Sequence, residues 1–424
     1  MNGEVGRFAF AVFQPKESPC GLFAAQVGKS CYSTRGFKEI ALFEGAAEGS
    51  YRQVCQRLNR QWRQPDAIGP GSLQAEVQQE GRGFDADMER WANGVLQCNG
   101  FDAQAQPVAG QELRPGPWQA LEEAPLEQAR QELINEAPES LQTALSGQEL
   151  LKEQYEVKEQ TAYCSVDDVW SKRQKAHRQK KGKPRTVGGG PAPAPQPAAE
   201  GELKFVHNSC ARVQFMGNTY TLVAKGLGQL LVWLAGLLLG NRLLDCNWLF
   251  MVDGERSIRN AIVETFAWRS IRLLLDWFHV KKKCQTQLSM AINNKERRNQ
   301  VLLELLPFLW YGLLDKAIQY LQSLNPAWIK NKAELEKLAD YFDRHRNAIP
   351  NYALRKKLGL PNSNNPVEKA NDELVAQRQK NNGMSWSDNG STHLAKVIAI
   401  NVNGERNNWL RSGKLTFRLR KEAA

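Results

Sequence analysis

Residues 248–254 read Trp-Leu-Phe-Met-Val-Asp-Gly, an uninterrupted apolar run that ends at an aspartate and a glycine. A short, wholly apolar run of this kind is typical of a strand that is covered on both faces of its sheet. Residues 271–276, Ile-Arg-Leu-Leu-Leu-Asp, repeat the pattern and also end at an aspartate. Helical patterns alternate with these strands, so the sequence predicts an α/β fold in which helices flank a mixed sheet.

More strands are expected before this pair. Residues 161–170, Thr-Ala-Tyr-Cys-Ser-Val-Asp-Asp-Val-Trp, read as a strand. Residues 203–223 read as a β-hairpin or meander whose last turn is at 217–218, an Asn that follows a Gly. The apolar run over 226–240 is shorter than the roughly 20 residues that cross a bilayer, so it predicts a buried core helix.

The later part of the chain is mainly helical in pattern. Residues 281–361 carry apolar residues at helical spacing and predict an all-helical insertion. A further helix is expected after it, because Asn364 or Asn365 can cap a helix and Pro366 suits the first turn. Glu368 lies in that first turn.

The remaining regions differ in composition. Residues 1–110 form a mainly helical N-terminal region, in which 51–61 and 72–80 have the outline of a helix-turn-helix, or of two ordinary helices in a small domain. Residues 111–160 are rich in glutamate and predict a solvated helical connector. Residues 186–201 are rich in proline and glycine and predict an exposed linker.

The charge balance points to a polyanionic partner. The net charge is +11 and the pI is near 9.2, and Lys and Arg gain affinity by releasing counterions from phosphates. Nucleic acid is therefore expected ahead of a membrane surface, and residues 401–424 add a basic, partly disordered C-terminal tail. The eight cysteines include no CxxC pair and the first residues lack the pattern of a signal peptide, so the cytoplasm is the expected location.

Three carboxylates suit a two-metal site. Transfer of a DNA phosphodiester needs an activated oxygen nucleophile and a stabilised leaving oxygen, which two magnesium ions held by carboxylates can provide. Asp167, Asp253 and Glu368 lie at strand ends and at a helix start, which are rigid places for ligands. An aspartate after a strand is also often only a turn former or a helix cap.

Two neighbouring acids leave the assignment open. Asp168 competes with Asp167, because adjacent residues of a strand point to opposite faces. Asp276 is compatible with a fourth carboxylate near the metals, a structural hydrogen-bond acceptor, or the true second ligand in place of Asp253.

Five motifs in order resemble a known family. They are Ser165-Val-Asp-Asp-Val-Trp-Ser-Lys-Arg-Gln-Lys, Val252-Asp-Gly-Glu-Arg-Ser-Ile, Leu275-Asp-Trp-Phe-His-Val-Lys-Lys-Lys-Cys, Pro366-Val-Glu-Lys and Gly383-Met-Ser-Trp-Ser. Over roughly residues 160–410 the chain resembles DDE transposases of bacterial insertion sequences related to the Mutator-like group. The resemblance implies a ribonuclease H-like catalytic domain over 161–400 with a helical insertion before the glutamate.

The resemblance also implies roles for individual residues. Asp167, Asp253 and Glu368 match the catalytic acids, which would hold two Mg²⁺ ions that Mn²⁺ can replace. Asp168, Asp276 and His279 would then surround these ligands.

The expected partner is double-stranded DNA, both the terminal inverted repeats of a transposon and the target, bound by a homodimer or a larger assembly. Basic residues near the motifs are expected to contact the DNA backbone, although a solvated charged face explains them equally well. Trp386 is compatible with base stacking or with core packing. The residues are Lys172, Arg173, Lys175, Arg178, Arg256, Lys281, Lys282, Lys369 and Trp386.

The leading hypothesis is a transposase that cuts DNA and joins strands. A nuclease of the same fold that cuts without joining is the alternative within enzymes. A domesticated or inactive DNA-binding protein is the alternative outside them.

Overall fold

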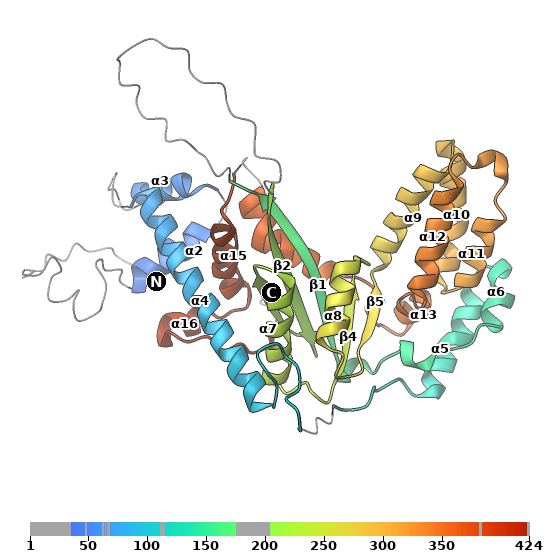
Figure 1. Ribbon diagram of the computed structural model, residues 1–424, viewed down its shortest axis with the longest axis horizontal. Coiled ribbons are helices and arrows are strands. Elements are labelled where there is room, and N and C mark those ends of the chain that lie inside the picture. The colour runs from blue at the N-terminus through green and yellow to red at the C-terminus, as the bar shows by residue number, and fades with distance from the viewer. Residues whose placement is uncertain are drawn as a thin grey trace, which may run out of the picture. The chain divides into compact units, whose positions relative to one another are not determined.

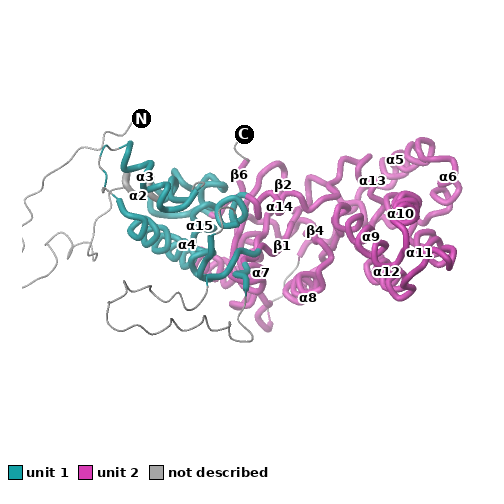
Figure 2. The backbone as a smooth tube through the Cα atoms, turned by 90° about the horizontal axis from the view of Figure 1, so that it is seen from above, with its two compact units in different colours: residues 1–87, 170–207, 373–416 teal, residues 88–169, 208–372, 417–424 magenta. Residues whose placement is uncertain are grey.

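The computed structural model describes residues 35–46, 49–61, 63, 65, 68–110, 115–174, 204–380 and 384–421. They fall into two compact units (Figure 2). Unit 1 takes its residues from 1–87, 170–207 and 373–416, and unit 2 from 88–169, 208–372 and 417–424. The expected linker at 186–201 lies outside the described residues.

A mixed sheet is the centre of unit 2, as the sequence predicted. Within the described residues it has six strands in the order β5-β4-β1-β2-β3-β6 (Figure 1). β1 pairs in parallel with β4, and β4 with β5, whereas β3 pairs antiparallel with β2 and with β6. The strands are β1 (Thr161–Lys172), β2 (Phe205–Phe215), β3 (Asn218–Ala224), β4 (Asn247–Val252), β5 (Arg272–Leu275) and β6 (Arg420–Lys421).

The parallel part of the sheet is covered on both faces. All six residues of β4 are buried, which is why its sequence is apolar throughout. Helix α7 (Leu227–Gly240) is also apolar around most of its circumference, and it packs against β3 and α8 (Arg256–Thr265). Such a helix is stable only when neighbours cover it on several sides.

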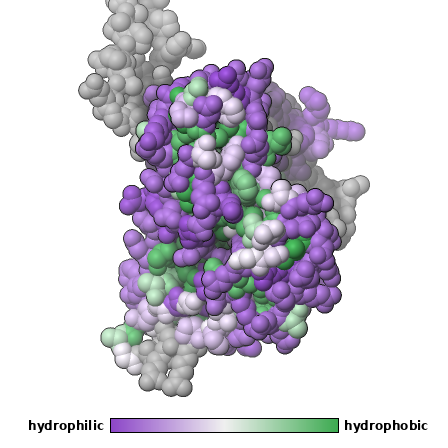
Figure 3. Space-filling view, turned by 90° about the vertical axis from the view of Figure 1, so that its right-hand side faces the viewer, coloured by the Kyte–Doolittle hydropathy of each residue, from purple (hydrophilic) through white to green (hydrophobic). Residues whose placement is uncertain are grey.

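A block of helices follows β5 in unit 2. Helices α9 to α12 pack against one another, and α13 packs against α10 and α5 (Figure 1). Hydrophilic side chains cover most of the face that lies on the right in Figure 1, with small apolar patches between them (Figure 3). The helices are α5 (Glu123–Glu136), α6 (Glu139–Ser146), α9 (Trp277–Ala291), α10 (Lys295–Trp310), α11 (Leu314–Gln322), α12 (Lys332–Arg344), α13 (Tyr352–Lys357) and α14 (Asn365–Asn371).

Short turns of 3₁₀-helix join these helices and strands. They are η1 (Lys152–Gln154), η2 (Lys158–Gln160), η3 (Pro326–Trp328) and η4 (Arg346–Ala348).

In the described part of unit 1, the regular structure is helical apart from the ends of β1 and β2. Leu42, Phe84, Trp386 and Leu394 are among the residues of its core. The helices are α2 (Arg35–Ala46), α3 (Tyr51–Gln61), α4 (Pro70–Cys98), the π-helix η5 (Asp372–Lys380), α15 (Asp388–Val402) and α16 (Arg406–Ser412). The helix predicted at 72–80 is thus part of α4, which has 29 residues and continues into unit 2.

Three details of the sequence prediction are wrong. The 111–160 region is not only a solvated connector, because Leu126 and Leu133 of α5 are buried against Leu354 of α13. The C-terminal region is ordered over most of its length, since it forms α16 and β6. The hairpin turn is at Met216-Gly217, where both residues have positive φ, rather than at 217–218.

None of the helices described in the structure is long and apolar enough to cross a bilayer.

Candidate functional site

Three aspartates lie at one level of the parallel strands. The β1–β4 pairing runs from Thr161–Asn247 to Ser165–Met251, and the same offset of 86 positions (247 − 161) aligns Asp167 with Asp253. The β4–β5 pairing ends at Val252–Leu275, so its next position aligns Asp253 with Asp276. Adjacent strands are about 4.8 Å apart, and ligands of such sheets bind at the carboxyl ends of the strands.

Asp167 and Asp253 influence each other electrostatically. Burial, and then the negative charge of Asp253, raise the pKa of Asp167 to about 7. Asn371 Nδ2 donates a hydrogen bond of 2.8 Å to Asp167 Oδ2, and the Asp168 amide donates one of 2.9 Å to Oδ1. The Asp168 carboxylate accepts a hydrogen bond from Ser209 Oγ on β2. The structure therefore places Asp167, rather than Asp168, beside Asp253.

The turn after β4 fixes Asp253. Its Oδ1 accepts a hydrogen bond of 2.8 Å from the Glu255 amide. Gly254 between them has φ +91°, and a Cβ there would lie 2.8 Å from the Tyr341 hydroxyl. Glycine is thus required at this position by both backbone conformation and space.

Asp276 uses both carboxylate oxygens within the protein. Its Oδ2 accepts hydrogen bonds from the His279 amide (2.9 Å) and ring Nδ1 (2.8 Å), and its Oδ1 accepts one from the Asn364 amide (3.0 Å). Its side chain is 1 % exposed. Burial would raise the pKa of Asp276, but these hydrogen bonds outweigh burial and lower it. Of the three roles left open by the sequence, the structural acceptor is the one that this geometry supports.

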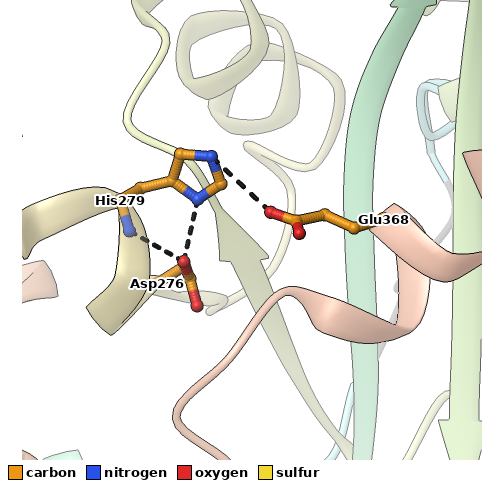
Figure 4. Close-up of side chains that lie close together, drawn as sticks. All are labelled: Asp276, His279 and Glu368. Atoms are coloured by element: carbon orange, nitrogen blue, oxygen red, sulfur yellow. Dashed lines mark hydrogen bonds and ion pairs between the residues drawn. The ribbon is translucent and has the colours of Figure 1, made fainter. Parts of the chain in front are cut away.

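His279 lies between Asp276 and Glu368 (Figure 4). Its Nε2 is 3.6 Å from Glu368 Oε1, while Nδ1 faces Asp276. The hydrogen bond to Asp276 is the main reason that the pKa of His279 is raised, and the charges of Glu368 and Asp253 add to it. Asp276 therefore orients the imidazole toward Glu368.

A buried ion pair supports the segment that leads to Glu368. Arg355 of α13 makes two hydrogen bonds to Glu156, of 2.6 and 2.7 Å, and both side chains are almost fully buried. Arg355 also donates to the Pro361 carbonyl and to Asn362 Oδ1. Together with the Asn364–Asp276 hydrogen bond, these contacts fix the start of α14 beside the ends of β4 and β5.

In the described part of the chain, the residues whose ligand atoms lie close enough to share a metal ion are not the predicted triad. Asp276, His279 and Glu368 offer ligand atoms within 4.8 Å of one another, whereas Asp167 and Asp253 are outside this set. Because Asp276 is 1 % exposed and already accepts three hydrogen bonds, His279 Nε2 and Glu368 are the more accessible groups of that cluster. Within the described residues, Asp167 and Asp253 influence each other electrostatically, whereas Glu368 contacts His279 and is not within ligand distance of both aspartates.

The donor set fits a hard divalent cation. The negative charge of Asp253 acts on the partly buried Asp167 carboxylate, and the charge of His279 offsets this effect only in part. Oxygen donors with uncompensated negative charge are what Mg²⁺ and Mn²⁺ prefer.

Comparison with known protein families, curated proteins and solved structures gave no significant match.

The expected DNA-contacting residues are spread over both units. Arg256 and Lys282 line a pocket beside Asp253, and Lys281 and Lys369 are exposed on α9 and α14. Lys172 is exposed at the end of β1. Lys175 and Arg178 lie outside the described residues.

Two expected contacts have structural partners in unit 1. The guanidinium of Arg173 forms an ion pair of 2.8 Å with Asp388. Trp386 is 6 % exposed, packs edge-on against Tyr51 and donates a hydrogen bond to the Gln379 carbonyl. Core packing is therefore the role that the structure gives Trp386, in place of the base contact.

Several residues near the aspartates were missed from the sequence. Asn371 contacts Asp167, and Arg259 and Arg344 line the pocket beside Asp253. Arg259 is three residues after Arg256 and therefore on the same helix face, which was a usable signal. Arg344 is on α12, distant in sequence, and no local pattern connects it to the site.

Proposed function

We propose that this chain is a metal-dependent DNA transposase with a ribonuclease H-like catalytic core, which cuts DNA at the ends of a mobile element and joins them to a target. The observation that carries the proposal is the register that aligns Asp167, within β1, with Asp253, which directly follows the adjacent parallel strand β4, so that the strand end predicted for Asp167 is wrong. Ends of parallel strands and the start of a nearby helix are the rigid positions that a two-metal site uses.

Asp167, Asp253 and Glu368 would hold the cations, two Mg²⁺ or Mn²⁺. When bound, such cations lower the pKa of a water nucleophile and neutralise charge on the transferred phosphate. The protein keeps Asp167 in place through Asn371 and Asp253 through the Glu255 amide. The Glu368 side chain is 37 % exposed, which leaves it room to move. In this proposal, Glu368 turns from His279 toward Asp167 and Asp253 when cations bind.

Asp276 and His279 would act as positioning residues. Asp276 caps α9 and binds the start of α14, so one buried carboxylate fixes both helices. His279 then contacts Glu368 through the ring nitrogen that faces away from Asp276. This arrangement resembles the hydrogen bonding that orients ligands around metal sites in general.

A strand-transfer assay tests the proposal. Labelled duplexes taken from the DNA on either side of the gene would be incubated with the protein and unlabelled target in Mg²⁺ or in EDTA. We expect joined products in Mg²⁺ only, and none with Asp253→Asn. Asp315→Asn is the matched control, because that carboxylate is exposed on α11 and its surface ion pair contributes little.

The other outcomes identify the alternatives. Cut but unjoined DNA in Mg²⁺ would indicate a nuclease of the same fold. DNA binding without any metal-dependent cutting, unchanged by Asp253→Asn, would indicate a DNA-binding protein without catalysis.

A further inference from the structure

A large pocket adjoins the site, and Asp253 and His279 are among its lining residues. Its volume is about 840 Å³, far above the ~30 Å³ that one water molecule occupies in the liquid. Helices α8, α9 and α12 form its walls, all within unit 2. We call it the basic pocket; Arg256, Arg259, Lys282, Lys283 and Arg344 are its basic residues.

The basic and acidic side chains that line the basic pocket come from different elements. Its five Lys and Arg side chains come from three helices, whereas its acidic lining residues, Asp253 and Glu255, both follow β4. Glu255 already accepts a hydrogen bond from Ser257. The basic pocket therefore combines cation-binding groups that follow β4 with anion-binding groups on three helices.

His345 is a buried lining group whose ring packs against Tyr341. It is 8 % exposed, and its Nδ1 has no hydrogen-bond partner in the structure. Burial, and then the charges of Arg259 and Arg344, lower the pKa of His345 to about 4. Two guanidinium groups and a neutral imidazole thus converge with no protein carboxylate between them, which is an arrangement suited to an anion.

Nucleic acid explains these features better than a free ion. The volume exceeds that of one phosphate, and the basic residues are spread over three helices rather than gathered around one point. One end of the pocket is the aspartate at which the proposed chemistry takes place. A polymer of regularly spaced phosphates is the anion that can lie at Asp253 and in the pocket simultaneously.

We propose that the basic pocket binds the nucleotide next to the scissile phosphate, with Arg259, Arg344 and His345 on its phosphate and Lys282 and Lys283 on the following one. This inference rests on the proposed function, because it takes the strand at Asp253 to be the one that is cut. The pocket sets the position of that strand relative to the metal ligands.

Salt-dependent DNA binding tests the inference. Anisotropy of a fluorescein-labelled duplex would be measured in EDTA between about 50 and 200 mM salt. Arg259→Gln/Arg344→Gln should reduce the slope of log K against log salt by about 0.9, since both residues contact one phosphate and each phosphate contact of a duplex contributes about 0.9. Lys282→Gln/Lys283→Gln changes only exposed side chains and should have a similar effect without a risk to folding.

Lys332→Gln/Lys337→Gln is the matched control. It removes the same two charges from exposed positions of α12 outside the pocket, where each lysine makes only a surface ion pair. We expect its slope to equal that of the wild type within about 0.5, less than one phosphate contact.

The outcomes separate this inference from the proposed function. If wild-type protein cuts and joins DNA while both pocket variants keep the slope of the control, the pocket does not bind the strand and the inference is overturned. If the pocket variants lose slope but wild-type protein never cuts DNA in Mg²⁺, the pocket binds nucleic acid and the transposase proposal fails. If wild-type protein binds no DNA, both are wrong.

Discussion

Asp167 of β1 is in register with Asp253, the residue that directly follows the adjacent parallel strand β4, 86 residues further along the chain (253 − 167). The pairing that aligns them ends two residues earlier, at Ser165–Met251, so both carboxylates extend past the last paired residues. Their repulsion, added to burial, raises the pKa of Asp167 to about 7. The site is therefore strained electrostatically without a cation, and this strain can be measured.

Removing one carboxylate of this pair should stabilise the metal-free fold. Asp167→Asn keeps the side-chain shape and removes the repulsion, so we expect the free energy of unfolding in EDTA at pH 8 to rise by about 1–3 kcal/mol. Mg²⁺ at ten times its Kd should stabilise the wild type by about 1.4 kcal/mol and the variant much less. Thermal unfolding with and without Mg²⁺ measures both. An equal response of the two proteins to Mg²⁺ would contradict a metal role for Asp167.

Asp276 should matter for folding more than for metal binding. Asp276→Ala removes the cap of α9 and leaves the buried Asn364 amide without its acceptor, so we expect a loss of about 1–3 kcal/mol in stability. Chemical denaturation measures the loss. Calorimetric titration with Mn²⁺ should give the wild-type number of sites, and loss of a site would instead make Asp276 a direct ligand.

Removing only Arg355 from the buried Arg355–Glu156 pair should lower the free energy of unfolding more than replacing both residues. Arg355→Met leaves the Glu156 carboxylate buried without its partner, and we expect a loss of about 3–5 kcal/mol. Arg355→Met/Glu156→Leu removes both charges and should recover part of it. Denaturant unfolding of the wild type, Arg355→Met, Glu156→Leu and the double variant gives the coupling energy. Additive losses in the double variant would show that the two charges do not depend on each other.

His345 should make the protein less stable in acid. The unfolded imidazole binds a proton below about 6.5, but burial lowers the folded pKa of His345 to about 4. The unfolded state therefore binds more protons between these values, and stability falls as the pH decreases from 6.5 to 4. This shift in the pKa of His345 corresponds to about 3 kcal/mol in the free energy of unfolding. The difference in stability between His345→Gln and the wild type, measured by thermal unfolding, should shrink or change sign between pH 7.5 and pH 4.5.

Two glycines of α4 in unit 1 should respond in opposite ways to alanine. A Cβ at Gly81 would lie 2.5 Å from the backbone oxygen of His393, so Gly81→Ala should cost about 1–3 kcal/mol. Gly83 has nothing within 4 Å, and Gly83→Ala should stabilise the helix by about 0.5–1 kcal/mol. A melting temperature unchanged by Gly81→Ala would show that α4 and α15 pack less closely than the Gly81–His393 contact indicates.

Much of the secondary structure could be predicted because it is encoded locally. The apolar runs that became β4 and β5, and the apolar helix α7, are each explained by their own residues. The α5 helix was misjudged for the same reason. Its glutamates indicated solvent exposure, and nothing nearby in the sequence showed that Leu126 and Leu133 meet α13.

The sequence by itself determined that acids follow the apolar strands and that Glu368 begins a helix, since strand periodicity and capping depend on neighbouring residues. Only the tertiary structure decided what each acid does. Asp253 and Asp276 follow strands of the same pattern, but Asp276 is buried and accepts hydrogen bonds from α9 and from the Asn364 amide, which is 88 residues away. Hydrogen-bond donors and basic side chains from distant helices meet only when the chain packs, so the difference between a free carboxylate and a structural one is a property of the fold.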